Sequence, residues 1–165
     1  MDLEKFLELL VDWSKVRGID SLSWKSQLKL YYEETFECRT ALDENELMME
    51  YGDRIVCLAN CGLIMFLNDP SETENDFVRG RHVNLNDLIE NDLETALCNR
   101  QWLQAIHFVI DEMVADDLNP PECFKLTWDK IKDRKGMIVG DKWVKWKDLT
   151  ETQREEYTER EKEFL

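Results

Sequence analysis

Two acidic clusters at helical spacing restrict how this chain can fold. The first is Glu33, Glu34 and Glu37, and the second, after twelve intervening residues, is Glu50 and Asp53. Within each cluster the carboxylates are three or four positions apart, so on a helix they project from one side and repel each other by roughly 0.2–0.5 kcal/mol per pair. A fold that encloses such a cluster needs a counter-charge, and a divalent metal ion is the usual one.

The residues around both clusters predict two helices that carry the acids within partly apolar stripes. One helix is expected from Ser21 or Ser23 to about residue 42, and the other from Glu44 to Leu67. At 3.6 residues per turn, Leu30 and Ala41 flank Glu34 and Glu37, and Cys57, Asn60 and Ile64 follow Asp53. Because a solvated face seldom has such apolar ends, we expect the two stripes to face each other across an antiparallel helix pair.

The rest of the chain also shows helical periodicity, and only six glycines and three prolines interrupt its 165 residues. Further helices are predicted from Asp2 to Gly18, from a cap near Asn84 to about Leu97, from Trp102 to Met113 and from Asn119 to about Arg134. Residues 68–83 are polar and predict a loop. Residues 135–145 predict a hairpin, and Thr150 with Gln153 predicts a capping box that opens a terminal helix. We therefore predict an all-α fold with one short hairpin.

The net charge of −15 argues against a non-specific grip on nucleic acid or on an anionic membrane. No apolar stretch is long enough to span a bilayer. The chain starts with an acidic amphipathic segment rather than a signal peptide, and its five cysteines form no CxxC pair. These features predict reduced thiols in a cytoplasmic protein.

Four or five carboxylate ligands suit hard cations, Mg²⁺ or Mn²⁺, rather than zinc. Such ions commonly bridge protein carboxylates to substrate phosphates and keep part of their water. One of these waters, once deprotonated, can attack phosphorus. The alternative is that the glutamates belong to solvated helix surfaces and bind no metal.

The two clusters resemble the signature of the MazG-like, all-α nucleoside triphosphate pyrophosphohydrolases, in which EExxE is followed, after a dozen or more residues, by ExxD. In this chain the motifs are Glu33-Glu34-Thr35-Phe36-Glu37 and Glu50-Tyr51-Gly52-Asp53. Residues 12–19 are similar to the end of the family's first helix, and 131–149 to the tail of phage-type members. The resemblance covers residues 5–67 and 119–149.

This resemblance implies a helical bundle, with a four-helix core and accessory helices, over residues 1–149, and a charged helix or tail over 150–165. It implies Mg²⁺-dependent hydrolysis of (deoxy)nucleoside triphosphates between the α- and β-phosphates by a homodimer or homotetramer. The products are nucleoside monophosphate and pyrophosphate. By motif position, Glu34, Glu37, Glu50 and Asp53 would ligate the metal, and Glu33 would activate the attacking water or support the ligands.

The densest basic segment, residues 130–135, lies at the C-terminal end of the helix predicted from Asn119 to about Arg134. We hypothesise that Lys132, Arg134 and Lys135 hold the β- and γ-phosphates of the substrate. The alternative is a helix end whose basic side chains complement the helix dipole. Asp129 stands where the resemblance leads us to expect asparagine, so a nucleotide contact at this position is not expected.

Three residues are candidates for a base or sugar pocket. Trp24 could stack on a base, with Gln27 reading the edge of that base. Asn60 lies about two turns beyond Asp53 on the same stripe, where a buried amide needs a partner. The alternative for Trp24 is packing in the core.

Non-catalytic functions are also compatible with the sequence. An acidic helical surface can imitate nucleic acid and occupy the groove of a DNA-binding protein. A relative could also bind nucleotide as a regulator without hydrolysing it. A mimic needs exposed, scattered carboxylates, whereas these lie in stripes with apolar ends, which favours the hydrolase.

Overall fold

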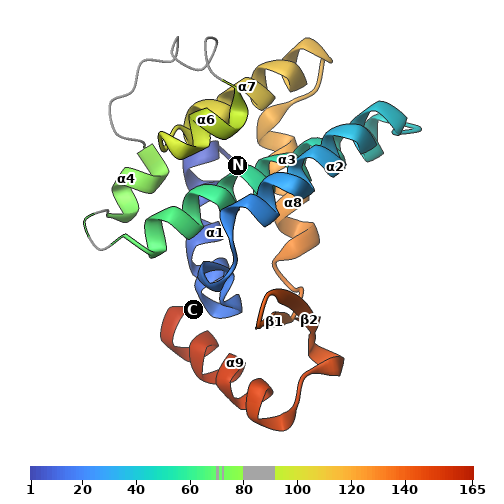
Figure 1. The fold of residues 1–165 in the computed structure, drawn as a ribbon. Helices are drawn as coiled ribbons and strands as arrows, with labels where there is room; N and C mark the ends of the chain where they lie inside the picture. The colour runs from blue at the N-terminus through green and yellow to red at the C-terminus, as the bar shows by residue number, and fades with distance from the viewer. Residues whose placement is uncertain (70, 72, 80–91) are drawn as a thin grey trace.

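The protein is an all-α fold with one small sheet, described by a computed structural model over residues 1–69, 71, 73–79 and 92–165 (Figure 1). Its helices in these ranges are α1 (Leu3–Arg17), α2 (Trp24–Thr40), α3 (Glu44–Leu67), α4 (Glu74–Arg79), α6 (Leu93–Cys98), α7 (Trp102–Ala115), α8 (Pro120–Ile131) and α9 (Glu151–Phe164). Strands β1 (Gly136–Val139) and β2 (Lys142–Lys145) form the predicted hairpin. None of the helices in the described ranges has the length and apolar character needed to cross a bilayer.

Capping residues in the sequence fix several helix boundaries. Asp2 accepts the backbone N–H of Lys5 at 2.8 Å, and Asp43 accepts that of Glu46 at 2.8 Å. At the end of α1, Gly18 takes a left-handed conformation with φ of 71°, which its lack of a side chain permits. The predicted extents of α1, α2 and α3 and the capping box of α9 are confirmed for this reason.

α8 ends at Ile131, earlier than predicted, because α1 provides donors for the carbonyl of Ile131 and for a carbonyl beyond it. The indole Nε1 of Trp13 donates to the carbonyl of Ile131 at 3.1 Å. The buried guanidinium of Arg17 donates through Nε to the carbonyl of Arg134, also at 3.1 Å. Because these carbonyls already have hydrogen-bond donors, the chain needs no further helical turn and can enter the hairpin.

The predicted loop over residues 68–83 is wrong in part, because α4 lies within it. The backbone N–H of Thr73 donates to Oδ2 of Asp76 at 2.8 Å at the start of this helix. Phe77 is fully buried, with its ring centroid 5.8 Å from that of Phe66 and 6.1 Å from that of Trp102. Tertiary burial thus stabilises a helix too short to form by propensity alone.

The helix predicted from a cap near Asn84 lies mostly outside the described residues. The described chain resumes at Asp92, whose side chain accepts the backbone N–H of Thr95 at 2.9 Å and caps α6.

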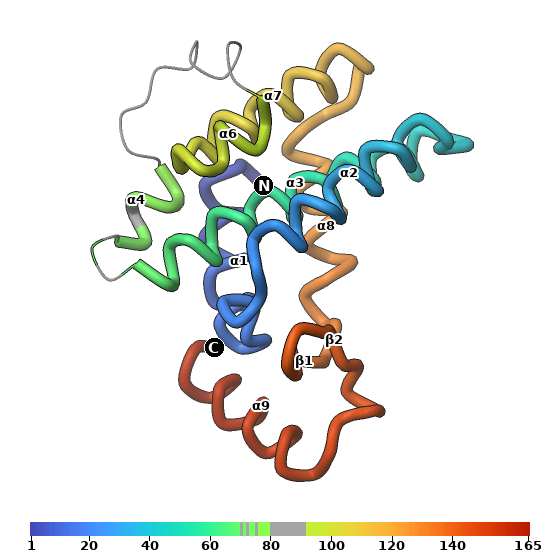
Figure 2. Tube along the Cα trace, in the orientation of Figure 1, coloured from blue at the N-terminus to red at the C-terminus, as the bar shows by residue number. Residues whose placement is uncertain are grey.

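α3 is the central helix of the fold. In Figure 1 it crosses the molecule, and α1, α2, α7 and α8 pack against it. Its fully buried Ile55, Leu58 and Leu63 supply much of the core. Figure 2 shows that the N-terminal part of α3 leaves the body of the protein together with α2. The acidic residues of both helices therefore lie at the boundary between the buried core and the solvent.

The hairpin and α9 form a second, smaller core beside α1. β1 and β2 pair antiparallel, with Gly136 opposite Lys145 and Ile138 opposite Trp143. The buried side chains of this core come from α1, β1, α9 and the segment before α9: Val16, Met137, Tyr157 and Leu149. The C-terminal helix is thus attached to α1 rather than extended into solvent.

We expect the Arg17→Met substitution to lower the free energy of unfolding by roughly 2–3 kcal/mol, because it leaves the buried carbonyl of Trp13 and the partly buried carbonyl of Arg134 without their charged donor. Chemical denaturation followed by circular dichroism measures this change. The exposed Lys162→Met on α9 serves as the control and should change the free energy by less than about 0.5 kcal/mol. Equal effects of the two substitutions would contradict the role of Arg17.

Candidate metal centre

The acidic clusters meet because α2 and α3 form a helical hairpin. Only residues 41–43 join the two helices. In this turn the backbone N–H of Leu42 donates to the carboxylate of Glu46 at 2.6 Å. Further along, Nη2 of Arg54 on α3 donates to the hydroxyl of Tyr31 on α2 at 3.0 Å. These contacts hold the helices antiparallel, with Glu34 opposite the second cluster.

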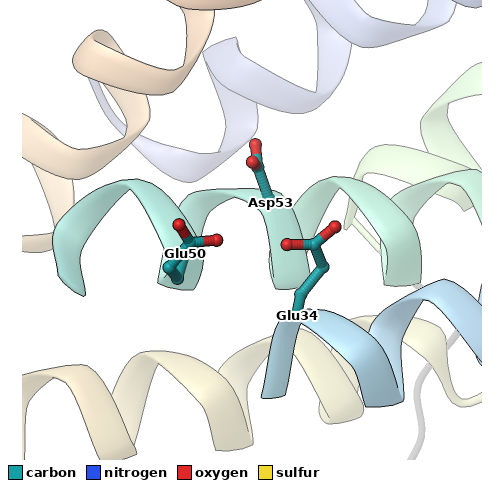
Figure 3. Close-up of side chains that lie close together, drawn as sticks. All are labelled: Glu34, Glu50 and Asp53. Carbon is teal, nitrogen blue, oxygen red and sulfur yellow. The ribbon is translucent and has the colours of Figure 1, made fainter. Parts of the chain in front are cut away.

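Glu34, Glu50 and Asp53 converge at the α2–α3 contact. Each offers a carboxylate oxygen, and the three oxygens lie within 4.8 Å of one another. Figure 3 shows Glu34 reaching from α2 toward Glu50 and Asp53 on α3. All three side chains are half-buried. Three of the four predicted ligands therefore lie close enough to share one cation.

The three carboxyl groups do not ionise independently. Burial, the charge of Asp53 and a hydrogen bond shared with Glu50 raise the pKa of Glu34 to about 8. Burial also raises the pKa of Glu50, although its hydrogen bond with Glu34 opposes that shift. Without a metal, Glu34 therefore carries a proton at neutral pH, and a bound cation would displace that proton.

Lys130 supplies a positive charge to this cluster that sequence analysis did not assign to it. Its ammonium donates to Oδ2 of Asp53, in an ion pair that is about three-quarters buried on both sides. Lys130 comes this close because Gly52 on α3 has no side chain and lets α8 approach. A Cβ at this position would meet Oγ1 of Thr127 at 1.9 Å, so only glycine permits the contact. Four residues before Thr127, Sγ of Cys123 on α8 also contacts α3, where it donates to the carbonyl of Met48 at 3.2 Å.

A signal for Lys130 was present in the sequence. Cys123, Thr127 and Lys130 follow one another at four and three positions, so they lie on one face of α8. The first two are buried against α3. A lysine that continues a buried helix face points toward the packed neighbour rather than into solvent.

Glu33 and Glu37 lie beside the cluster but are exposed and are not among the three converging carboxylates. The charge of Glu37 contributes to the raised pKa of Glu34, and that of Glu33 to the raised pKa of the Cys57 thiol. On α2 the expected enclosure is incomplete, because Leu30 is 40 % exposed. The reason is that α2 projects from the body, whereas α3 continues into the core, where Cys57, Asn60 and Ile64 are buried.

The predicted phosphate ligands have other neighbours in the described part of the chain. Nζ of Lys132 lies 2.7 Å from Oδ1 of Asp129. This lysine, together with Lys125, holds the pKa of Asp129 at about 2. Arg134 and Lys135 line a hollow beside β2. The basic residue with an ion pair to the acidic cluster is therefore Lys130.

Two of the three predicted pocket residues lie in contact. Nδ2 of Asn60 donates to Oε1 of Gln27 at 3.1 Å, and both side chains are buried. Oδ1 of Asn60 has no hydrogen-bond partner, which is unusual for a buried amide. Trp24 packs against the core, and its backbone carbonyl accepts from Sγ of Cys61 at 3.4 Å.

The donor set fits a hard divalent cation. Mg²⁺ binds oxygen at about 2.0–2.1 Å, so its ligands lie about 3–4 Å apart around an octahedron. Carboxylate oxygens of Glu34, Glu50 and Asp53 within 4.8 Å of one another need only small side-chain rotations to reach this spacing. Glu37, on the next turn of α2, is the further carboxylate that could complete the set.

We expect the metal-free protein to lose thermal stability as the pH rises from about 5 to 8. The pKa of Glu34 is raised to about 8 in the folded state, so folding favours the protonated carboxyl, and this contribution is lost as the group ionises. Glu34→Gln should flatten the pH dependence and raise Tm at pH 8. Differential scanning fluorimetry in EDTA measures both effects.

The exposed Glu163→Gln on α9 is the control for the titration and should retain the slope of the unmodified protein. An unchanged slope in Glu34→Gln would contradict the assignment of the raised pKa.

We expect Lys130→Met to strengthen Mn²⁺ binding by about tenfold. An ammonium a few ångströms from a divalent ion near the surface opposes its binding by on the order of 1–2 kcal/mol. The same substitution should lower Tm in EDTA, since Asp53 loses its counter-charge. Isothermal titration calorimetry measures the affinity. Lys132→Met, which removes an equal charge paired with Asp129, is the matched control. Weaker or unchanged Mn²⁺ binding in Lys130→Met would refute the competition.

Comparisons with protein-family models, with curated proteins and with solved structures find no match for this chain.

Proposed function

We propose that this protein hydrolyses (deoxy)nucleoside triphosphates between the α- and β-phosphates, with Mg²⁺ or Mn²⁺ as cofactor. The products are a nucleoside monophosphate and pyrophosphate. The observation that carries the proposal is the convergence of Glu34, Glu50 and Asp53, which stand at the ligand positions of the EExxE and ExxD motifs. Their oxygen-only donor set is the kind that holds a cation shared with substrate phosphates.

In this proposal the acidic residues and Lys130 have separate roles. Glu34, Glu50 and Asp53, joined by Glu37, would hold the cation, which would neutralise phosphate charge and lower the pKa of the attacking water. Glu33, exposed beside the cluster, would accept a proton from that water through its carboxylate. Lys130, released from Asp53 when the cation binds, would be within reach of a phosphate oxygen.

The proposed pocket for the base or sugar lies further along α3, at Asn60 and Gln27. The unpaired Oδ1 of Asn60 is a free acceptor in a buried place, suited to an exocyclic amine or a hydroxyl. Trp24 stays a candidate for stacking, although its packing against the core also accounts for its position. Lys132, Arg134 and Lys135 stay candidates for phosphate contacts.

The proposal includes assembly of the chain as a homodimer or homotetramer. Three large apolar side chains of α2 are substantially exposed: Leu30 at 40 %, Tyr32 at 54 % and Phe36 at 63 %. Burial against another copy of the chain would remove these side chains from water.

The deciding experiment measures pyrophosphate release from a panel of canonical, deoxy and modified nucleoside triphosphates with Mg²⁺ and with Mn²⁺. Glu50→Gln should reduce turnover by about 100-fold or more, because it removes a charged ligand while preserving the shape of the side chain. Its circular dichroism spectrum should be unchanged. Glu163→Gln, of equal charge change on α9, should keep full activity.

Two outcomes would count against the hydrolase. Folded protein that releases no pyrophosphate from any substrate with either metal excludes the activity. If calorimetry then detects metal-dependent nucleotide binding, the chain is a nucleotide-binding regulator, and if it detects none, the acidic interaction protein is the better account.

A further inference from the structure

The hairpin region reverses the charge of the chain. Residues 130–147 contain seven lysines or arginines and two aspartates, in a protein of net charge −15. Four of these basic side chains and two tryptophans line one hollow of about 640 Å³: Arg134, Lys135, Lys145, Lys147, Trp143 and Trp146. The acidic cluster contributes no residue to it. The hollow therefore combines positive charge with aromatic surface.

The hairpin geometry directs two of these side chains to the same side. Trp143 and Lys145 are two positions apart on β2, so they project from one face of the strand. Gly136 lies opposite Lys145, and a Cβ on it would come within 2.6 Å of Cζ2 of Trp143. The missing side chain at Gly136 thus gives the indole ring of Trp143 its place in the hollow.

The two tryptophans have different surroundings. The ring of Trp146 has the ammonium of Lys135 and the guanidinium of Arg154 each 5.6 Å from its centre, and Tyr157 packs against it edge-on. Trp143 stacks on Trp13 at a centroid distance of 6.4 Å and an interplanar angle of 13°, yet it stays 38 % exposed. An incoming planar ring can therefore extend the stack of Trp13 and Trp143 without displacing a protein group.

Three of the cations around the hollow have no negative partner in the part of the chain that the structure describes. Among the described residues, no carboxylate oxygen lies within 4.0 Å of Arg134, Lys145 or Lys147, and Lys135 reaches Glu161 only at 4.0 Å. By contrast, the neighbouring Lys130 and Lys132 both form ion pairs. Several unpaired cations beside one hollow attract an anion with more than one charge.

We propose that this hollow is a nucleotide-binding site that does not require a metal. The base would stack on Trp143, and the phosphates would contact Arg134, Lys145 and Lys147. Stacking of a base on an aromatic side chain contributes about 1–3 kcal/mol, and arginine matches phosphate oxygens with two parallel donors. The inference shares Arg134 with the phosphate candidates of the proposed hydrolase but uses none of the acidic residues, so it does not rest on metal-dependent turnover.

The test is calorimetric titration of the full chain with ATP in EDTA, where the acidic cluster repels an anionic nucleotide. ATP should bind saturably and at least about tenfold tighter than inorganic tripolyphosphate or adenosine, since only ATP offers both ring and charge. Lys145→Glu should weaken binding by about tenfold or more. The matched control is Lys142→Glu, the same charge change on the same strand outside the hollow, and it should alter the affinity by less than about twofold.

Four outcomes would overturn the inference. They are no ATP binding in EDTA, tripolyphosphate binding as tight as ATP, equal weakening by Lys142→Glu and Lys145→Glu, and a short single-stranded oligonucleotide binding about tenfold tighter than ATP. The last would identify a nucleic-acid strand as the ligand. Glu34→Gln should leave ATP binding in EDTA unchanged, so this result and the pyrophosphate assay can fail independently.

Discussion

The contact between α2 and α3 contains more negative charge than two packed helices accommodate unaided, and much of the surrounding structure compensates for it. Glu34 takes up a proton at neutral pH, and Lys130 reaches from α8 to Asp53. The buried Arg54, which is 4 % exposed, donates to Tyr31 on α2 and so also joins the two helices. The proton on Glu34 and the ammonium of Lys130 together reduce the repulsion where the two acidic helix faces pack.

Arg54 also determines how the neighbouring helices are placed. Its Nη2 lies 2.6 Å from Oε2 of Glu112 on α7 and 3.0 Å from the hydroxyl of Tyr31 on α2. The rings of Tyr31 and Tyr51 lie 5.3 and 5.2 Å from its guanidinium carbon. A buried arginine without these partners would cost several kcal/mol, so the positions of α2 and α7 relative to α3 are coupled through one side chain. Arg54 thus helps to position both the helices that carry the candidate metal centre and the core helix α7.

Local features of the sequence were sufficient to predict the main helices and all three converging acids. Asp2, Ser23, Asp43 and Thr150 cap the helices they precede, and the 3.6-residue period identifies which carboxylates share a face. Features that depend on distant contacts were missed. α4 forms because Phe77 enters the core, and α8 stops where Trp13 and Arg17 bind the carbonyls of Ile131 and Arg134. Lys130 reaches Asp53 only through the close approach at Gly52.

Acidic and basic residues gather in different parts of the chain, so the two proposed sites need different conditions to bind an anion. Without a divalent cation the acidic cluster repels phosphate, and the hollow at Arg134, Lys145 and Lys147 attracts it. A bound cation offsets most of the negative charge of Glu34, Glu50 and Asp53 and offers a phosphate a direct ligand, but its field has little effect beyond about 10 Å at 0.1 M salt. Anion binding at the cluster should therefore depend steeply on metal, whereas binding at the hollow should depend mainly on ionic strength. The two dependences, measured on one protein, separate the sites without any substitution.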